Sequence, residues 1–383
     1  MDAKEELTEL RRQIDGIDEG MIALFQSRME ISRRVAGIKR ENNMAILDAE
    51  RERQVVERAA ASAEESLRGE ASLLMRSIMA LSRKYQREIL FHGETPLLPP
   101  PAKPVEEDIV CAFQGAPGAW GEQAAARLLP DADLRPEEFF EDVFKAVKEK
   151  RARYGVVAIE NSQTGAIGET YDLLRKYGCF IVKRIWIDIR HCLLAPAETA
   201  LADIREVFSH PQGFRQCGGF LRKYAWELKA CRNTAVAAKT AAGLKSGKTA
   251  AIGSRRAAEI NGLQVLVPDI MDSAANRTSF VMIATEPEYD EGSDLISVTF
   301  STAHRSGALC ETLLPFMARD INLTRIESRP ASPGQYRFFA ELQGNILDEG
   351  IVSTLRQAAA SCAYFEVIGC YCCPGGTHDM IVE

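Results

Sequence analysis

The first 92 residues follow a helical pattern, and no proline occurs before position 96. From Leu7 to Ile38, apolar side chains recur at steps of three and four residues, as on one face of an α-helix. This pattern predicts one helix of about 35 residues, and such a helix needs a packing partner along its length. A break at Asn42-Asn43 and an N-cap at Asp48 predict a second helix, and a third is expected over about residues 71–91. Three helices make a thin core, so we expect residues 1–92 to dimerise.

Two breaks divide the rest of the chain. Residues 93–108, GETPLLPPPAKPVEED, contain five prolines and are expected to form a semi-rigid linker. Over residues 109–286, short β-rich runs alternate with helices, which predicts an α/β domain with a mostly parallel sheet. After EPEYDEGSD, residues 294–374 have the order strand, helix, strand, strand, helix, strand, which is the ferredoxin-like arrangement, and residues 375–383 form a tail. We therefore expect a multidomain fold: all-α, then α/β, then ferredoxin-like.

Composition limits the classes of partner and compartment. A net charge of -7 over 383 residues argues against nucleic acid or an anionic membrane as the main partner. No apolar run approaches the length of a membrane span, and the N-terminus MDAKEELTEL is acidic, unlike a signal peptide. The ten cysteines are scattered, mostly within apolar runs, and are expected to be reduced and buried. These features favour a cytoplasmic protein.

The stretch DSAANRTSF, residues 272–280, has three possible interpretations. Asn276-Arg277-Thr278 matches a glycosylation sequon, but that modification requires secretion, which the N-terminus argues against. The stretch could instead be a turn that enters the strand TSFVMIA, or a place where a threonine hydroxyl takes part in chemistry. Local pattern alone does not separate these two.

Two cations interrupt the apolar stripe of the first helix. Arg28 lies within it, and Lys39 follows eleven residues later, within roughly 20° of the same helix face. A buried charge needs an anionic partner, because leaving it unpaired is costly. Either the two side chains extend out of the stripe to solvent or pair with internal acidic residues, or they bind an anionic ligand.

The cations belong to a larger array that resembles the all-helical chorismate mutase family, in which a long helix shared across a dimer builds two sites. The resemblance covers nearly all of residues 5–92. Eight residues fall on site positions of that family: Arg11, Arg28, Lys39, Asp48, Arg51, Glu52, Ser82 and Gln86.

Rearrangement of chorismate to prephenate needs no nucleophile, metal or cofactor, because the main task is to hold a dianion in a compact geometry. The resemblance implies three residues that bind carboxylates: Arg11 from the partner chain, Arg28 and Arg51. It implies that Lys39 and Gln86 stabilise charge on the ether oxygen in the transition state. Glu52 would bind the substrate hydroxyl, supported by Asp48 and Ser82.

Three motifs of the α/β region and the C-terminus resemble dinucleotide-binding, phosphate-binding or zinc-binding motifs, but each lacks a feature that the motif requires. GAPGAWG (115–121) has Ala116 where the dinucleotide fingerprint G-x-G-x-x-G needs its first glycine. SGKT (246–249) resembles a phosphate loop, but it lies between a helix and a following strand, the reverse of the required order. Cys370, Cys372, Cys373 and His378 have no second cysteine pair to complete a zinc site. We therefore expect no cofactor and no metal.

Three clusters of polar residues remain: Glu160-Asn161-Ser162, Ser209-His210-Pro211-Gln212 with Gln216, and Arg277-Thr278-Ser279-Phe280. In this order and near these spacings they resemble prephenate dehydratase across residues 109–285. That family folds as two α/β lobes around a cleft, as in periplasmic binding proteins. The site residues implied are Glu160, Asn161, Ser162, Ser209, Gln216, Arg277 and Thr278.

Prephenate loses carbon dioxide and its ring hydroxyl together to give phenylpyruvate. Hydroxide leaves poorly, so a donor must assist as the C–O bond breaks. The resemblance implies that Thr278 is this donor, that Arg277 pairs with a carboxylate or supports the loop, and that the other residues line the cleft. One position departs from the family: Gly121 stands where a serine is usual, so a backbone amide or water would replace its hydroxyl.

The C-terminal segment, residues 294–374, contains two motifs of non-catalytic residue types: Gly307-Ala308-Leu309 at a strand-to-helix turn and Glu327-Ser328-Arg329-Pro330 at the end of the next strand. On a βαββαβ unit they resemble the ACT domain of prephenate dehydratases, which binds phenylalanine between two copies. The implied effector residues are Gly307, Ala308, Leu309, Glu327, Ser328 and Arg329. The glycine would let the backbone approach the ligand, and amides at a helix N-terminus suit its carboxylate.

These resemblances predict a bifunctional enzyme that acts on chorismate and prephenate, is inhibited by phenylalanine, and is a dimer or larger. Two alternatives remain open at this point. A fusion to a prephenate dehydrogenase would require the nicotinamide loop that GAPGAWG lacks. A two-lobed regulator that has lost catalysis is favoured by Gly121 but not by the intact Glu160 and Thr278.

Overall fold

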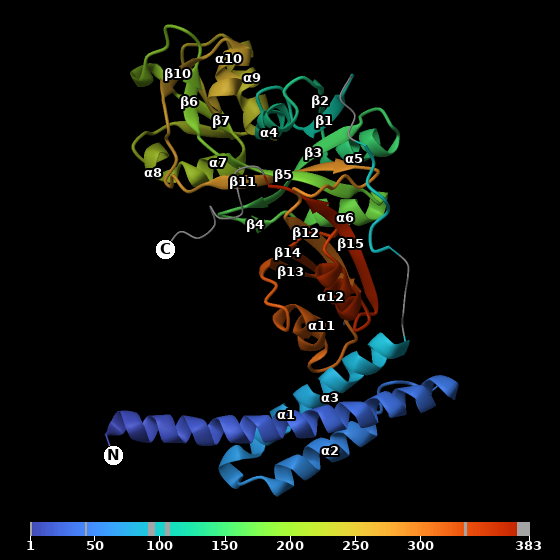
Figure 1. Ribbon diagram of the computed structural model, residues 1–383. Helices are drawn as coiled ribbons and strands as arrows, with labels where there is room; N and C mark the ends of the chain where they lie inside the picture. The colour runs from blue at the N-terminus through green and yellow to red at the C-terminus, as the bar shows by residue number, and fades with distance from the viewer. Residues whose placement is uncertain (1, 43, 91–95, 104–107, 333–334, 374–383) are drawn as a thin grey trace. The chain divides into compact units, whose positions relative to one another are not determined.

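The computed structural model describes residues 2–42, 44–90, 96–103, 108–332 and 335–373 (Figure 1). They form two compact units, which are treated separately below. The first comprises Met1–Pro96, Thr302–Asp320 and Ser353–Tyr364, and the second comprises Leu97–Ser301, Ile321–Val352 and Phe365–Glu383. Asn43, Phe91, His378, part of the predicted linker and the predicted tail lie outside the described residues.

The N-terminal residues form the three predicted helices. Asp2 and Glu5 form a capping box at the start of α1, and Asp48 caps α2 by accepting a hydrogen bond of 3.0 Å from the Arg51 amide. The first helix is 39 residues long, close to the predicted length, and the third begins three residues before the predicted start. The helices are α1 (Ala3–Glu41), α2 (Ala49–Ser62) and α3 (Arg68–Leu90), with a short 3-10 helix at Glu65–Leu67.

Most of the apolar stripe of α1 is exposed within one chain. Its buried residues are Ser32 and Ala36, whereas exposure is 50% at Leu7, 62% at Ile17 and 74% at Leu24. A contiguous apolar surface of this length is unusual on a monomer and marks an interaction face. No helix in the described ranges is long and apolar enough to cross a membrane.

The first lobe of the second unit is built on a mixed sheet. Strand β1 is parallel to β2 and β3, but β11 lies antiparallel between β3 and β5. The expectation of a mostly parallel sheet is therefore wrong here, because β11 returns from a distant part of the chain. The elements are β1 (Val110–Gln114), α4 (Trp120–Leu128), β2 (Asp133–Glu137), α5 (Phe140–Lys148), β3 (Tyr154–Asn161), β4 (Gly165–Ala166), α6 (Gly168–Tyr177), β5 (Phe180–Asp188) and β11 (Arg277–Ala284).

The second lobe has a five-stranded sheet in the order β10-β6-β9-β7-β8, also mixed in direction. Its helices begin at side-chain caps where the sequence offers them: His210 caps α7, Asn233 caps α9 and Ser254 caps α10. The elements are β6 (Cys192–Ala195), a 3-10 helix (Leu201–Asp203), β7 (Glu206–Ser209), α7 (Pro211–Gln216), α8 (Gly218–Leu221), β8 (Glu227–Ala230), α9 (Thr234–Leu244), β9 (Thr249–Gly253), α10 (Arg255–Asn261) and β10 (Gln264–Val267).

Two chain segments that join the lobes run side by side. The Ile189 amide donates to the Asn276 carbonyl at 2.8 Å, and the Ile270 amide donates to the His191 carbonyl at 2.9 Å. The chain leaves the first lobe after β5 and returns just before β11. DSAANRTSF is thus the return crossing, and the predicted two-lobed α/β fold is confirmed.

The C-terminal strands follow the predicted βαββαβ order and pair as β13-β14-β12-β15, the ferredoxin-like arrangement. Strand β15 also pairs with β5, in parallel register at Gly369 and Ile181, so one sheet continues from β13 to β2. The elements are β12 (Leu295–Ser301), α11 (Ala308–Met317), β13 (Leu323–Ser332), β14 (Gln335–Gln343), α12 (Glu349–Ala359) and β15 (Tyr364–Tyr371).

The central strands of this sheet are buried on both faces. Phe144, Leu174 and Ile181 belong to one apolar cluster, and Phe113 and Met282 belong to another. Burying a side chain of this size stabilises the fold by about 1.5–3 kcal/mol. The sheet is therefore a rigid support for the residues at the ends of β3 and β11.

Candidate active sites

Helices α1 and α3 bring together three of the predicted mutase residues. Arg28 Nη1 donates to Ser82 Oγ, and one turn further Gln86 Nε2 donates to Ser32 Oγ at 2.9 Å. Burial lowers the pKa of Arg28, and the nearby Glu52 carboxylate opposes this effect. The array is thus a half-buried polar cluster in an otherwise apolar contact.

Arg83 joins this cluster, although the sequence pattern did not single it out. It is 5% exposed and forms an ion pair with Glu52. The sequence feature that could have indicated Arg83 is its position directly after Ser82, on a helix that packs against two others. Among the described residues, Gln86 Oε1 is buried and has no hydrogen-bond partner, so it can still accept a bond from a ligand.

The remaining predicted mutase residues lie apart from the cluster within one chain. Lys39 Nζ donates to the Ile46 carbonyl, and the side chains of Asp48 and Arg51 are exposed. Arg11 is exposed and precedes Arg28 by 17 residues (28 minus 11), which is roughly 25 Å along a helix. Arg11 therefore does not reach Arg28 of its own chain.

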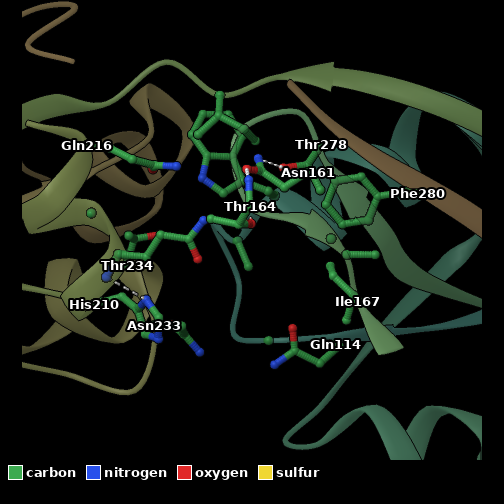
Figure 2. Close-up of a pocket in the computed structure, with 18 of the residues that line it drawn as sticks. Gln114, Asn161, Thr164, Ile167, His210, Gln216, Asn233, Thr234, Thr278 and Phe280 are labelled. Carbon is green, nitrogen blue, oxygen red and sulfur yellow. Dashed lines mark hydrogen bonds between the residues drawn. The ribbon is translucent and has the colours of Figure 1, made fainter. Parts of the chain in front are cut away.

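A pocket of about 420 Å³ lies between the two lobes of the second unit (Figure 2). Asn161 and Thr278 line it from the first lobe, and His210 and Gln216 line it from the second. Its other lining residues include Gln114, Trp120, Gly121, Thr164, Ile167, His191, Asn233, Thr234 and Phe280. Of the residues predicted for this site, Asn161, Gln216 and Thr278 reach the pocket.

Thr278 and Asn161 face each other across paired strands (Figure 2). Asn161 Nδ2 donates to Thr278 Oγ1 at 2.9 Å, and the two residues are 5% and 9% exposed. The orientation of the amide is determined by its other end, because Asn161 Oδ1 accepts from the Gln163 and Thr164 amides at 3.1 and 3.2 Å. Thr278 Oγ1 is thus an acceptor toward Asn161, and its own proton is left to donate elsewhere.

A bulge in β3 determines which side chains face the pocket. Thr278 pairs with Asn161 and Ser279 with Glu160, but Phe280 pairs with Ala158, so Ile159 is the extra residue. Ala158 and Asn161 line the pocket, three residues apart, and Glu160 does not. The carboxylate of Glu160 instead forms ion pairs with Arg184 at 3.1 Å and Arg325 at 3.0 Å.

Three other residues predicted for the cleft have structural partners outside the pocket lining. Ser162 Oγ donates to the Ala275 carbonyl at 3.0 Å and accepts from the Arg277 amide at 2.9 Å, which fixes the return crossing. Ser209 is fully buried, and its hydroxyl donates to a backbone carbonyl. The Arg277 guanidinium pairs with Asp188 at 3.1 Å.

His191 is a pocket residue that sequence reasoning missed. It is 3% exposed, and its Nε2 lies 3.0 Å from Gln216 Oε1. Burial lowers the pKa of His191. Because Gln216 Oε1 can only accept a hydrogen bond, Nε2–H of His191 donates to it. Gln216 Nε2 then donates to Gln163 Oε1 at 3.1 Å. The sequence feature that could have indicated His191 is its position directly before the apolar strand CLLA, where the chain crosses between the lobes.

Two helices present their N-terminal ends to the pocket. Ala119 gives α4 no side-chain cap, and Ala119, Trp120 and Gly121 all line the pocket. Asn233 and Thr234 begin α9 and line it from the other lobe. Free amides at helix N-termini favour carboxylates. A Cβ at Gly121 would lie 2.7 Å from the Gln114 carbonyl oxygen, so glycine permits this close approach.

The predicted effector residues lie on two elements. Gly307, with φ 77°, precedes α11, whose first residues are Ala308 and Leu309. Glu327, Ser328 and Arg329 lie on β13. Cys370 and Cys373 are buried, and within the described part of the chain no group of His, Cys, Asp or Glu is placed to hold a metal.

Family models match both catalytic regions. Residues 111–288 match prephenate dehydratase, and residues 10–87 match chorismate mutase type II. The bifunctional chorismate mutase/prephenate dehydratase of Escherichia coli K12 is 31% identical over 97% of this chain and 97% of its own length. The chloroplastic arogenate dehydratase/prephenate dehydratase 2 of Arabidopsis thaliana is 36% identical over 73% of this chain and 78% of its own length.

A solved structure agrees with these matches. Prephenate dehydratase from Arthrobacter aurescens, in complex with L-Phe, superposes with a TM-score of 0.64 at 26% identity, covering 69% of this chain and 89% of that one. The match to the bifunctional Escherichia coli enzyme extends over both the helical cluster and the pocket. The chain belongs to the bifunctional chorismate mutase/prephenate dehydratases, which convert chorismate to prephenate and prephenate to phenylpyruvate in phenylalanine biosynthesis.

Proposed function

We propose that Thr278 donates the proton that assists departure of the ring hydroxyl of prephenate. The observation that carries this proposal is the 2.9 Å bond from Asn161 Nδ2 to Thr278 Oγ1. An oxygen that accepts such a bond becomes a better donor, because charge that develops on it is stabilised. Loss of carbon dioxide supplies the electrons and aromatisation supplies the driving force. Asn161 is therefore a positioning and polarising residue for Thr278.

The substrate carboxylates need positive potential in the pocket. The N-terminal ends of α4 and α9 supply it, since both face the pocket and α4 has no side-chain cap. Backbone amides near Gly121 take the place of the serine hydroxyl usual in the family. Gln216, oriented by His191, contacts a substrate oxygen from the second lobe.

In the helical segment, residues 1–92, Arg28 and Gln86 form the core of the mutase site. Arg28 binds a carboxylate, and Gln86 and Lys39 stabilise the ether oxygen in the transition state. Glu52 binds the hydroxyl, with Asp48 and Ser82 in support. Arg51 contributes a further cation, and the exposed α1 stripe supports a homodimer in which Arg11 enters the partner's site.

The C-terminal residues 294–374 bind phenylalanine and inhibit the enzyme. Support comes from the βαββαβ order and from the relative whose structure contains L-Phe. The effector residues are Gly307, Ala308, Leu309, Glu327, Ser328 and Arg329. Inhibition at a distance requires coupling between this site and a catalytic site within residues 109–286.

One experiment tests the catalytic assignments. Purified protein is given chorismate or prephenate, and both products are followed with and without phenylalanine. Thr278→Ala should abolish phenylpyruvate formation but leave prephenate formation intact, and the matched control Thr240→Ala on α9 should affect neither. A Thr278→Ala enzyme that forms phenylpyruvate at the normal rate would show that the donor is another group.

A further inference from the structure

A buried charged network lies behind the pocket, on the opposite face of the strand pair β3–β11. Arg184, 3% exposed, donates to Ser279 Oγ at 2.7 Å and to Glu160 Oε2 at 3.1 Å, and also pairs with Glu341. Burial alone would lower the pKa of Arg184, but Glu341 and Glu160 raise it, so the guanidinium stays charged. Tyr371 Oη donates to Glu341 at 3.0 Å.

The network reaches the pocket through chain neighbours. Ser279 follows Thr278 and Glu160 precedes Asn161, and these residues pair across the two strands. Side chains of adjacent strand residues point to opposite faces, so the Arg184 side of the sheet holds the backbone whose other side forms the pocket. A shift of Glu160 therefore moves Asn161, which holds Thr278.

Strand β13 contacts the first lobe of the second unit at two points. Arg325 donates to Glu160 at 3.0 Å, and Arg329 pairs with Asp172 on α6 at 3.2 Å. The Arg329 guanidinium lies against Gly168, where a Cβ would occupy its place. Residues 325 and 329 are four apart on one strand and so share a face.

Glu160 and Gly168, which Arg325 and Arg329 contact, are the two ends of one short segment, residues 160–168. This segment carries Asn161, Thr164 and Ile167 into the pocket. Its interior is ordered by Asn161 Oδ1, which accepts from Thr164 Oγ1 at 3.2 Å as well as from backbone amides. Glu160 anchors the first end to Arg325, and Gly168 seats Arg329 at the second.

We propose that β13 positions the dehydratase pocket by holding residues 160–168 at both ends through Arg325 and Arg329, and that an effector bound on β13 controls dehydration through these two anchors. The second part rests on the proposed function, in which phenylalanine contacts Glu327 and Arg329. Arg325 lies two residues before Glu327 and is 3.6 Å from its carboxylate, so a ligand that engages Glu327 perturbs Arg325. A ligand carboxylate at Arg329 competes with Asp172 for the same guanidinium.

The test compares Arg325→Gln, Asp172→Asn and Gly168→Ala in the full-length enzyme. Each breaks one anchor, and none removes a proposed ligand of phenylalanine. Arg356→Gln and Glu169→Gln are matched controls, since both residues are exposed and lie outside the network. Dehydratase kcat and KM, mutase rate and calorimetric phenylalanine binding are measured on the same preparations. The mutase rate and Arg325→Lys, which keeps the charge, separate loss of positioning from misfolding.

Without phenylalanine, Arg325→Gln and Gly168→Ala should lower dehydratase kcat several-fold, to about tenfold, with the mutase rate unchanged. Arg325→Lys should restore part of that loss. With phenylalanine, Arg325→Gln and Asp172→Asn should still bind it but show at least about fivefold weaker inhibition, as expected when coupling is lost. Anchor variants with wild-type kcat and wild-type inhibition would overturn the proposal. If phenylalanine neither binds nor inhibits the wild type, the effector assignment fails, and the kcat of Arg325→Gln still decides whether β13 positions the pocket.

Discussion

The two catalytic regions differ in how completely one chain builds them. The dehydratase pocket has the proposed donor, the partner of that donor and two helix N-termini within one compact unit, and Asn161 and Thr278 are almost fully buried. The helical region places Arg28, Ser82 and Gln86 together but leaves Arg11 and most of the α1 stripe exposed. One sheet thus organises a pocket within a single chain, whereas the helical site is open along α1, where the proposed homodimer would place a second copy.

The largest effect is expected from the most completely built site. Thr278→Ala should reduce dehydratase kcat by about 10²–10⁴-fold, because removing a positioned proton donor costs that much. Thr278→Ser should retain much of the rate, since the hydroxyl stays in place. Coupled assays with prephenate check this, and equal losses in the Ala and Ser variants would point to a role for the methyl group instead.

The next largest effect is expected from a mutation in the helical cluster. Arg28→Ala should lower mutase kcat/KM by about 10²–10³-fold, because it removes a charge-assisted contact to a dianion in a half-buried site. The dehydratase rate should be unchanged when prephenate is supplied directly. Chorismate disappearance monitors the first activity, and an unaffected mutase would place the substrate away from the Arg28–Ser82 contact.

Mixing variants tests whether the helical site spans two chains. Arg11→Ala and Arg28→Ala should each be inactive alone, and co-refolding them should restore about a quarter of wild-type mutase activity, because half of the random dimers carry one intact site. The readout is mutase activity after mixing in a 1:1 ratio. No recovery, with dimers present by sedimentation, would assign Arg11 to its own chain.

A smaller effect is expected at the first loop of the pocket. Gly121→Ser should lower the free energy of unfolding by about 1–3 kcal/mol, because its Cβ would collide with the Gln114 carbonyl. Urea denaturation followed by tryptophan fluorescence measures this. A Gly121→Ser enzyme of unchanged stability would mean that the loop accommodates the serine usual in the family.

The smallest effect concerns the buried histidine. Because burial lowers the pKa of His191 in the folded state, the unfolded chain binds a proton that the folded chain does not as pH falls through about 6.5. Wild type should therefore lose more stability between pH 7.5 and 5.5 than His191→Asn. Urea titrations of both proteins at the two pH values check the sign, and equal losses would mean that the fold does not lower the pKa of His191.

Local pattern predicted the elements well because helices and strands depend on periodicity and caps. Asp48 is the N-cap that the pattern indicated, and the βαββαβ order is as expected. Thr278, Asn161 and Gln216, three of the seven residues that the resemblance implied for this site, line one pocket. The wrong expectation was the mostly parallel sheet, because β11 pairs with β3, which lies more than a hundred residues earlier in the chain.

Long-range geometry explains what the sequence could not indicate. Read as a regular strand, β3 would place Glu160 on the same face as Ala158, but the bulge puts Asn161 on that face instead. Arg184, Arg325 and Glu341 come from three separate strands, and their meeting depends on sheet order rather than on local composition. His191 was missed because one histidine at a lobe crossing has no motif around it.

The pairing of β15 with β5 bears on how the chain can be dissected. Ending the chain before β12 would leave β5 as an unprotected edge strand, with unpaired backbone groups beside the apolar residues Ile181 and Val182. Such an edge recruits other chains, so a fragment that ends at the EPEYDEGSD break should aggregate. Strand β15 therefore covers part of the β5 edge, whatever ligand the C-terminal segment binds.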